Sequence, residues 1–169
     1  MGIDIGGIAT LRSPAGAALS LDGASNWMSV NAGGVLTRPQ TPYMRGQLNG
    51  QTNPYSGNPM LVTADVNTGP WNNATGYWTC PVAGYYLATM GGICGGMASS
   101  GYIYIYKNGS TICFTHWNHS GSWHYCSLSV IASCAAGDTL SFGLQSQNPA
   151  NAGMYGQSGH QMFSIALLA

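Results

Sequence analysis

The last ten residues of the chain, HQMFSIALLA (160–169), constrain the fold most strongly, because both sides of this segment are apolar. If the segment is a strand, its side chains alternate between two faces. One row holds Phe163, Ile165 and Leu167, and the other holds Met162, Ser164, Ala166 and Leu168. A strand with water on one face alternates apolar and polar side chains, whereas a strand covered on both faces is apolar throughout. We therefore expect other parts of the structure to cover both faces of this segment.

Charge is scarce along the whole sequence. Charged residues make up 5% of the 169 residues, against about 25% in typical soluble domains, and Glu is absent. The basic residues, Arg12, Arg38, Arg45 and Lys107, are too few to neutralise a nucleic-acid backbone. No apolar run reaches the roughly 18 residues of a membrane span, and residues 1–16 lack the pattern of a secretory signal. We expect no nucleic-acid binding, no membrane anchoring and synthesis in a cytoplasm.

The residue types that carry catalysis are few and scattered. The acidic residues are Asp4, Asp22, Asp65 and Asp138, which form no pair suited to acid–base chemistry. The cysteines are odd in number and lack CxxC spacing, which favours small buried side chains over a disulfide framework or a zinc site.

Two other patterns also give no chemical site. The histidines at 116, 119 and 124 lie near Cys113 and Cys126, but nothing in their spacing makes them converge on a metal. GGICGG (91–96) lacks the Lys-Ser/Thr ending of a phosphate loop and predicts a flexible turn. We expect no enzyme, no cofactor and no metal site.

Turn-forming residues divide the chain about every eight to twelve residues, and no segment shows a helical apolar stripe, which predicts an all-β fold. Residues 1–41 contain only short candidate strands and few large apolar side chains, so we expect an extended β-arm that serves for attachment. Residues 42–169 contain the clearer candidate strands, at 59–65, 84–90, 101–107, 110–116, 124–131, 138–144 and 160–168. This number of strands fits a β-sandwich or jelly roll.

The clearest local signal is YKNGS (106–110), because Asn108-Gly109 favours the positive φ angles of a two-residue type I′ hairpin. In the strand before this turn, the side chains of Tyr102, Tyr104 and Tyr106 share one face. Tyrosine is common in binding surfaces because its ring is apolar and its hydroxyl is polar. Surface tyrosines that only pack against each other across strands are the alternative interpretation.

Four stretches together resemble the globular head of complement C1q and its tumour-necrosis-factor-like relatives. They are WTCPVAGYYLA (78–88), YIYIYKNGS (102–110), SLSVIASCAAGDTLSFGL (127–144) and MFSIALL (162–168). The resemblance covers roughly residues 42–169 and implies a jelly roll that forms a homotrimer. Ile165 replaces a glycine of the family pattern, and the collagen stalk is missing. Asp65 and Asp138 are the only acids after residue 41, so we expect none of the calcium sites that some members carry.

The resemblance also implies two surfaces. The trimer interface would be formed by Tyr85, Leu87, Thr89, Met162, Ala166 and Leu168, around a threefold axis. Phe163, Ile165 and Leu167 would then fill the core of each subunit, which explains the two apolar rows. An outer contact surface, for a protein neighbour or a glycan, would be formed by Tyr102, Tyr104, Tyr106, Trp117 and Trp123.

A charge-poor trimeric jelly roll with a short arm resembles bacteriophage decoration (cement) and fibre-head proteins. The resemblance implies a virion structural protein, assembled in the host cytoplasm, that binds at junctions of capsid subunits. Its arm would add strands to the major capsid protein or to another virion protein. The first alternative is a receptor-binding tail fibre or spike tip that recognises a host-surface glycan, and the second is a ligand-binding module of the complement type.

Overall fold

The computed structural model describes residues 18–19, 28–30, 36–37, 41–48, 59–96, 99–119, 123–146, 152–155 and 159–168. The chain divides into two compact units, Met1–Gln40 and Thr41–Ala169. In the first unit an antiparallel sheet is formed by β1 (Ala18–Leu19), β2 (Met28–Val30) and β3 (Leu36–Thr37). Every regular element in the described residues is a strand, which confirms the all-β prediction. No helix in this part of the chain is able to cross a membrane.

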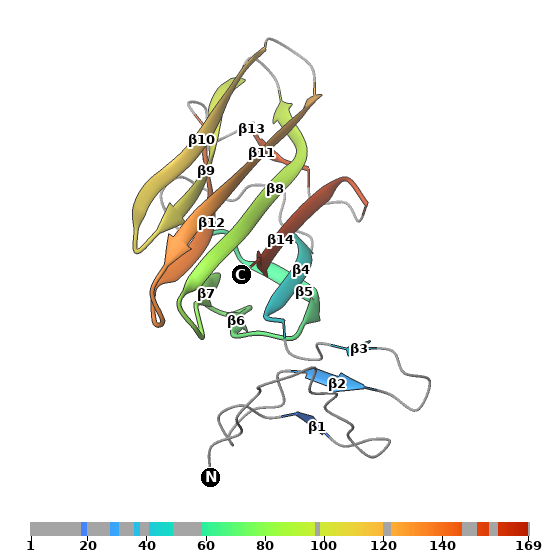
Figure 1. The fold of residues 1–169 in the computed structure, drawn as a ribbon. Helices are drawn as coiled ribbons and strands as arrows, with labels where there is room; N and C mark the ends of the chain where they lie inside the picture. The colour runs from blue at the N-terminus through green and yellow to red at the C-terminus, as the bar shows by residue number, and fades with distance from the viewer. Residues whose placement is uncertain are drawn as a thin grey trace. The chain divides into compact units, whose positions relative to one another are not determined.

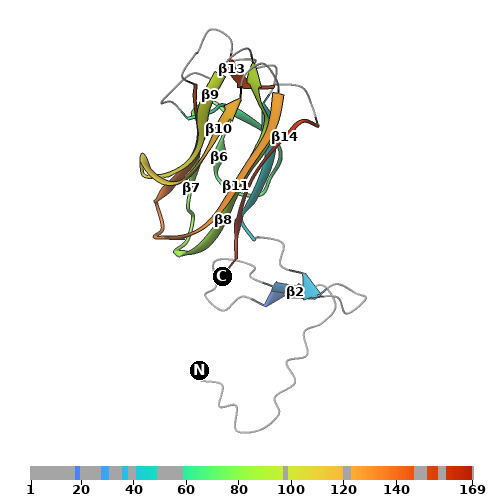
Figure 2. The ribbon, with the colours of Figure 1, turned by 90° about the horizontal axis from the view of Figure 1, so that it is seen from above.

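The second unit is a sandwich of two antiparallel sheets that lie face to face (Figures 1 and 2). The five-stranded sheet has the order β10-β9-β12-β7-β6. Its strands are β6 (Trp71–Asn72), β7 (Tyr77–Thr79), β9 (Ser99–Lys107), β10 (Ser110–His119) and β12 (Thr139–Ser146). The six-stranded sheet has the order β11-β8-β14-β4-β5, and β13 pairs with β8. Its strands are β4 (Tyr43–Leu48), β5 (Val62–Asn67), β8 (Gly84–Gly96), β11 (Trp123–Cys134), β13 (Ala152–Met154) and β14 (Gln161–Leu167).

Aromatic side chains from both sheets meet in the core. The rings of Phe142 in β12 and Phe163 in β14 are fully buried and lie edge to face, with centroids 5.2 Å apart. Trp78 in β7 and Tyr86 in β8 make a second edge contact at 6.3 Å. Edge-to-face aromatic pairs add about 0.5–1.5 kcal/mol to the free energy of area burial. These contacts bind the two sheets together and leave the opposite side of each sheet facing outward.

The β9–β10 hairpin forms as the sequence predicts. Asn108 and Gly109 both have positive φ angles, 50° and 76°, as a type I′ turn requires.

The prediction for residues 91–96 is wrong, because GGICGG is not a turn but the second half of β8. A Cβ atom on Gly91 would lie 2.6 Å from the Tyr125 hydroxyl oxygen, and one on Gly92 would lie 2.8 Å from the Met154 sulfur. Glycine leaves room at these positions for neighbouring side chains that cross the strand closely, and a larger residue would have to displace them.

Candidate functional site

The outward side of β8 and its two neighbours is the first candidate surface. We call it the β8 face, and it consists of Tyr85, Leu87 and Thr89 of β8, Tyr125, Ser127, Ser129, Ile131 and Ser133 of β11, and Met162, Ser164, Ala166 and Leu168 of β14 and its end. The alternate residues of these strands, such as Tyr86, Phe163 and Ile165, are fully buried in the core. The expected interface residues therefore all lie on one face, opposite the core.

The strand register aligns the β8 face in rows. Leu87 lies between Ile131 of β11 and Ala166 of β14. In the next row Thr89 lies beside Ser129, and their hydroxyl oxygens are 3.0 Å apart. The hydroxyl groups of Thr89 and Ser129 bond to each other within the sheet. Two hydroxyl groups of this row are therefore already satisfied within the sheet, and Ser164 lies on the other side of Thr89.

Much apolar area on the β8 face is exposed to water in the single chain. Tyr85 is 57% exposed, Met162 46% and Leu168 48%. Strand β11 adds Tyr125 at 61% and Ile131 at 60%, which the sequence interpretation had not included in the face. The alternation of HYCSLSVI (124–131) contained the signal, because it places Tyr125 and Ile131 on the row opposite the buried Cys126 and Leu128.

The outward side of β9 and β10 is the second candidate surface. We call it the tyrosine face, and it consists of Tyr102, Tyr104, Tyr106, Phe114 and His116. The rings of Tyr104 and Tyr106 stack with centroids 5.5 Å apart. The Tyr104 hydroxyl donates a hydrogen bond of 2.7 Å to Gln145. Phe114 is the most exposed member at 60%, and its place in the face was also missed from the sequence.

The prediction that Trp117 belongs to an outer contact surface is wrong. Trp117 is only 3% exposed, because β10 continues to His119 and puts this residue on the inward row. Its indole ring lies over Gly101, its partner on β9, where no side chain occupies the space. The side chain of Trp123 lies outside the described residues.

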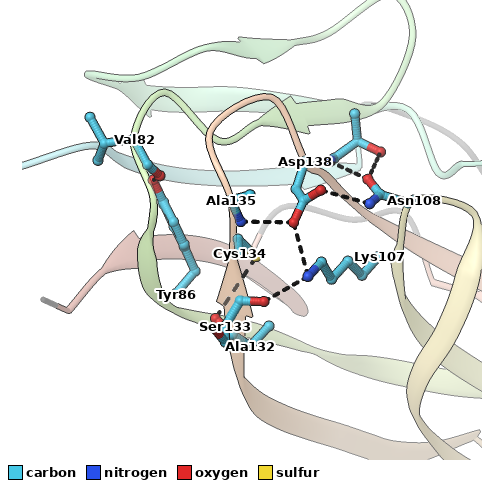
Figure 3. Close-up of polar contacts among 10 residues, drawn as sticks. Val82, Tyr86, Lys107, Asn108, Ala132, Ser133, Cys134, Ala135 and Asp138 are labelled. Carbon is cyan, nitrogen blue, oxygen red and sulfur yellow. Dashed lines mark hydrogen bonds and ion pairs between the residues drawn. The ribbon is translucent and has the colours of Figure 1, made fainter.

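A polar cluster joins the β9–β10 hairpin to the turn between β11 and β12 (Figure 3). The Asp138 carboxylate accepts hydrogen bonds of 2.8 Å from the Asn108 amide and from the Ala135 N–H. It also forms an ion pair of 2.9 Å with Lys107, whose ammonium group donates to the Ser133 carbonyl at 2.7 Å. Bonds from Asn108 and Lys107 lower the pKa of Asp138 to about 2.

The five cysteines are free thiols, and most of them are buried. Cys80, Cys94, Cys126 and Cys134 are buried free thiols, and Cys113 is half-buried. Burial raises the pKa of Cys80 to about 12. Hydrogen bonding to Cys126, together with burial, raises the pKa of Cys94. Within the described residues, no group of three or more His, Cys, Asp or Glu side chains is placed to hold a metal ion.

Known proteins resemble this chain in fold rather than in sequence. No protein-family model matches the sequence, and no curated protein matches it. Among solved structures, the fold is similar to that of the globular domain of zebrafish complement 1qA protein, with a TM-score of 0.59 and 15% identity. The match covers 76% of this chain and 98% of that domain. At this identity the likeness shows a C1q-like jelly-roll fold and no more.

Proposed function

We propose that the chain is a structural, non-catalytic protein that forms a homotrimer through the β8 face. The observation that carries this proposal is the exposed apolar area of Tyr85, Tyr125, Ile131, Met162 and Leu168 on strands that contain no Asp, Glu, Lys or Arg. Single apolar residues on a surface are ordinary, but a contiguous patch marks an interaction site. A second copy of the same face is a fitting partner, because it is equally uncharged.

The exposed fractions limit how strongly such a trimer is held. Complete burial of a Met or Leu side chain contributes about 1.5–3 kcal/mol. Because Met162 and Leu168 are 46% and 48% exposed, about half of that remains available on assembly. Over three chains these two positions supply about 4–9 kcal/mol, and Ile131, 60% exposed, adds about 3–5 kcal/mol. Losses of translational and rotational freedom subtract from this sum, so the tyrosines of the face must also contribute.

For the biological role, we propose a virion decoration protein that binds at junctions of capsid subunits and is attached by the unit Met1–Gln40. The support is the charge-poor composition and the division of the chain into a small β-unit and a C1q-like unit. A short β-unit is suited to adding strands to a neighbouring sheet.

Light scattering on the purified full-length chain tests the trimer directly. We expect three times the chain mass of 17.6 kDa, unchanged at about 1 M salt, because apolar burial rather than ion pairing drives the assembly. A mass of 17.6 kDa at micromolar concentration, which is that of a single chain, would refute the proposal. Quantification on purified virions tests the role: many copies on heads support decoration, whereas a few copies on isolated tails would contradict it.

The tyrosine face favours a second candidate function, a fibre or spike tip that recognises a neutral glycan. The half-buried rings of Tyr104 and Tyr106 lie side by side, and Phe114 leaves 60% of its surface in water. Aromatic rings and phenol hydroxyls suit sugars, which present both C–H surfaces and hydroxyl groups. A glycan array probed with the wild-type chain and with Phe114→Ala tests this function: binding that the substitution weakens supports it, and no binding contradicts it.

A further inference from the structure

The turn between β9 and β10 contains a chemically labile dipeptide, Asn108-Gly109. In such a dipeptide the backbone nitrogen of the glycine can attack the Cγ atom of the asparagine side chain. The new N–Cγ bond closes a five-membered succinimide, the Cγ–Nδ2 bond breaks, and ammonia leaves. Water then opens the ring to give aspartate or isoaspartate. Glycine makes this reaction fast, because it has no side chain to hinder its own backbone nitrogen.

Water reaches this turn freely, so burial does not protect it. Asn108 and Gly109 are both exposed. A Cβ atom built on Gly109 would meet no other atom within 4 Å. If exposure alone set the rate, this dipeptide would react as it does in an unfolded chain.

The contacts of the Asn108 side chain oppose the reaction. Its Nδ2 group donates a 2.8 Å hydrogen bond to the Asp138 carboxylate. Its Oδ1 atom accepts hydrogen bonds from the Thr139 backbone N–H at 2.7 Å and from the Thr139 hydroxyl at 3.3 Å. The backbone is tied to the same place, because the Asn108 N–H donates to the Thr139 carbonyl at 2.9 Å.

Other contacts hold the partner of this amide in place. The Asp138 carboxylate is itself fixed by the Ala135 N–H and by Lys107 (Figure 3). Both ends of the Asn108 amide are therefore directed at residues 138–139, and ring closure requires these bonds to break first. Hydrogen bonds to a charged acceptor are the strongest of this kind.

We propose that Asn108-Gly109 is a masked deamidation site, held unreactive in the folded chain by Asp138 and Thr139 and released when these contacts open. The product would weaken the contact that masks it. An aspartate at 108 sets a second carboxylate against Asp138, and like charges this close repel. An isoaspartate adds a methylene group to the backbone of a two-residue turn. Deamidation at this position would then irreversibly weaken the contacts between the β9–β10 hairpin and the β11–β12 turn.

Peptide mapping by mass spectrometry on the aged full-length chain tests the proposal. The chain is incubated in mildly alkaline buffer, folded or unfolded in urea, and isoaspartate is counted by enzymatic methylation. The sequence supplies an internal reference, since it contains a second Asn-Gly dipeptide at Asn49-Gly50. In urea we expect Asn108 and Asn49 to convert at similar rates. In the folded chain we expect Asn108 to convert at least about tenfold more slowly than in urea, because the hydrogen bond to the charged Asp138 must break before the ring can close. Equal rates at Asn108 in folded and unfolded chains would overturn the proposal.

A matched pair of variants separates the side-chain contacts from the turn itself. Asp138→Ala removes the acceptor of the Asn108 amide, so we expect about tenfold faster conversion in the folded variant. Lys107→Met removes the ion pair and leaves the Asn108–Asp138 bond, so we expect a smaller change. A folded Asp138→Ala with the wild-type rate would show that the turn alone protects Asn108 and would refute the role of Asp138.

If circular dichroism shows that Asp138→Ala is unfolded, the wild-type chain decides the question alone. Its conversion rate at Asn108 must then rise with urea in step with hydrogen exchange at the Asn108 and Thr139 amides. A rate that stays flat while those amides open contradicts the proposal.

Discussion

Replacing Met162 by lysine is the sharpest test of the β8 face. Met162 is 46% exposed in the single chain, so assembly can bury about half of it, worth about 0.7–1.4 kcal/mol per chain. A trimer contains three copies, and the loss is then about 2–4 kcal/mol. Since 1.4 kcal/mol corresponds to a factor of ten, the association constant should fall about 30-fold to 1,000-fold from lost burial alone. An ammonium group that is driven into the interface costs several kcal/mol more.

The matched control is Phe114→Lys, on the opposite sheet of the same chain. Phe114 is even more exposed, at 60%, and its substitution adds the same charge to the tyrosine face. Light scattering over a range of concentrations should show Met162→Lys shifted toward a single chain and Phe114→Lys unchanged. Circular dichroism should show both variants folded, because each side chain points away from the core.

Two results would refute this reasoning. If Met162→Lys keeps the wild-type mass at every concentration, the β8 face is not the contact between copies. If Phe114→Lys dissociates equally, the loss comes from added charge in general and not from the place where it is added.

Three further predictions concern stability, each measured by urea unfolding of the full chain. The bond with Asn108 is the main cause that lowers the pKa of Asp138 to about 2, so the ionised carboxylate adds to the free energy of unfolding. This contribution is complete above about pH 4 and is lost as the pH falls through 2. The difference in free energy of unfolding between wild type and Asp138→Asn should therefore shrink as the pH falls from 5 to 2, and a constant difference would contradict this. Phe163→Ala, at a fully buried position, should cost about 3–5 kcal/mol, whereas Phe114→Ala should cost under about 1 kcal/mol; equal losses would show that the core assignment is wrong. Gly101→Ala should cost about 1–3 kcal/mol, because the new methyl group meets the buried indole ring that crosses β9, and an unchanged midpoint would count against that packing.

The sequence predicted the features that depend on neighbours along the chain. Alternation in residues 101–107 places Tyr104 outward and Ile103 and Ile105 in the core, as the structure shows. The Asn108-Gly109 turn follows from the backbone preferences of two adjacent residues. Period-two patterns and turn residues are local signals, and one strand is enough to read them.

The errors concern contacts between strands that are distant in sequence. GGICGG has the composition of a turn, but it pairs with β11, β13 and β14 as a strand, and Tyr125 and Met154 pass over its glycines. Trp117 was expected on an outer contact surface, and it is buried because β9 offers Gly101 directly opposite it. In each case a glycine on one strand is explained by a large side chain on another, and the sequence alone does not state which strands are neighbours.

The polar cluster at the β11–β12 turn was missed for the same reason. Asn108 and Asp138 are 30 residues apart, and each belongs to a turn that the sequence explains without the other. Only the pairing of β9 with β12, which sets Lys107 opposite Leu140, brings the two turns together. A residue that is explained by its own turn can therefore also contact a residue far away in the sequence, and the turn pattern gives no sign of that contact.

The placement of charge explains why the β8 face suits association with another uncharged surface. In the part of the chain that the structure describes, the four charged side chains form two ion pairs, Arg45 with Asp65 at 2.8 Å and Lys107 with Asp138 at 2.9 Å. One pair lies on the neighbouring strands β4 and β5, and the other lies at the turns, so neither occupies β8, β11 or β14. Charged groups at an interface add desolvation costs and repel like copies. Arg45 lies beside Ser164 at the β4 edge of the β8 face, where its ion pair with Asp65 balances its charge, so the apolar side chains of a partner copy would meet no unpaired charge there.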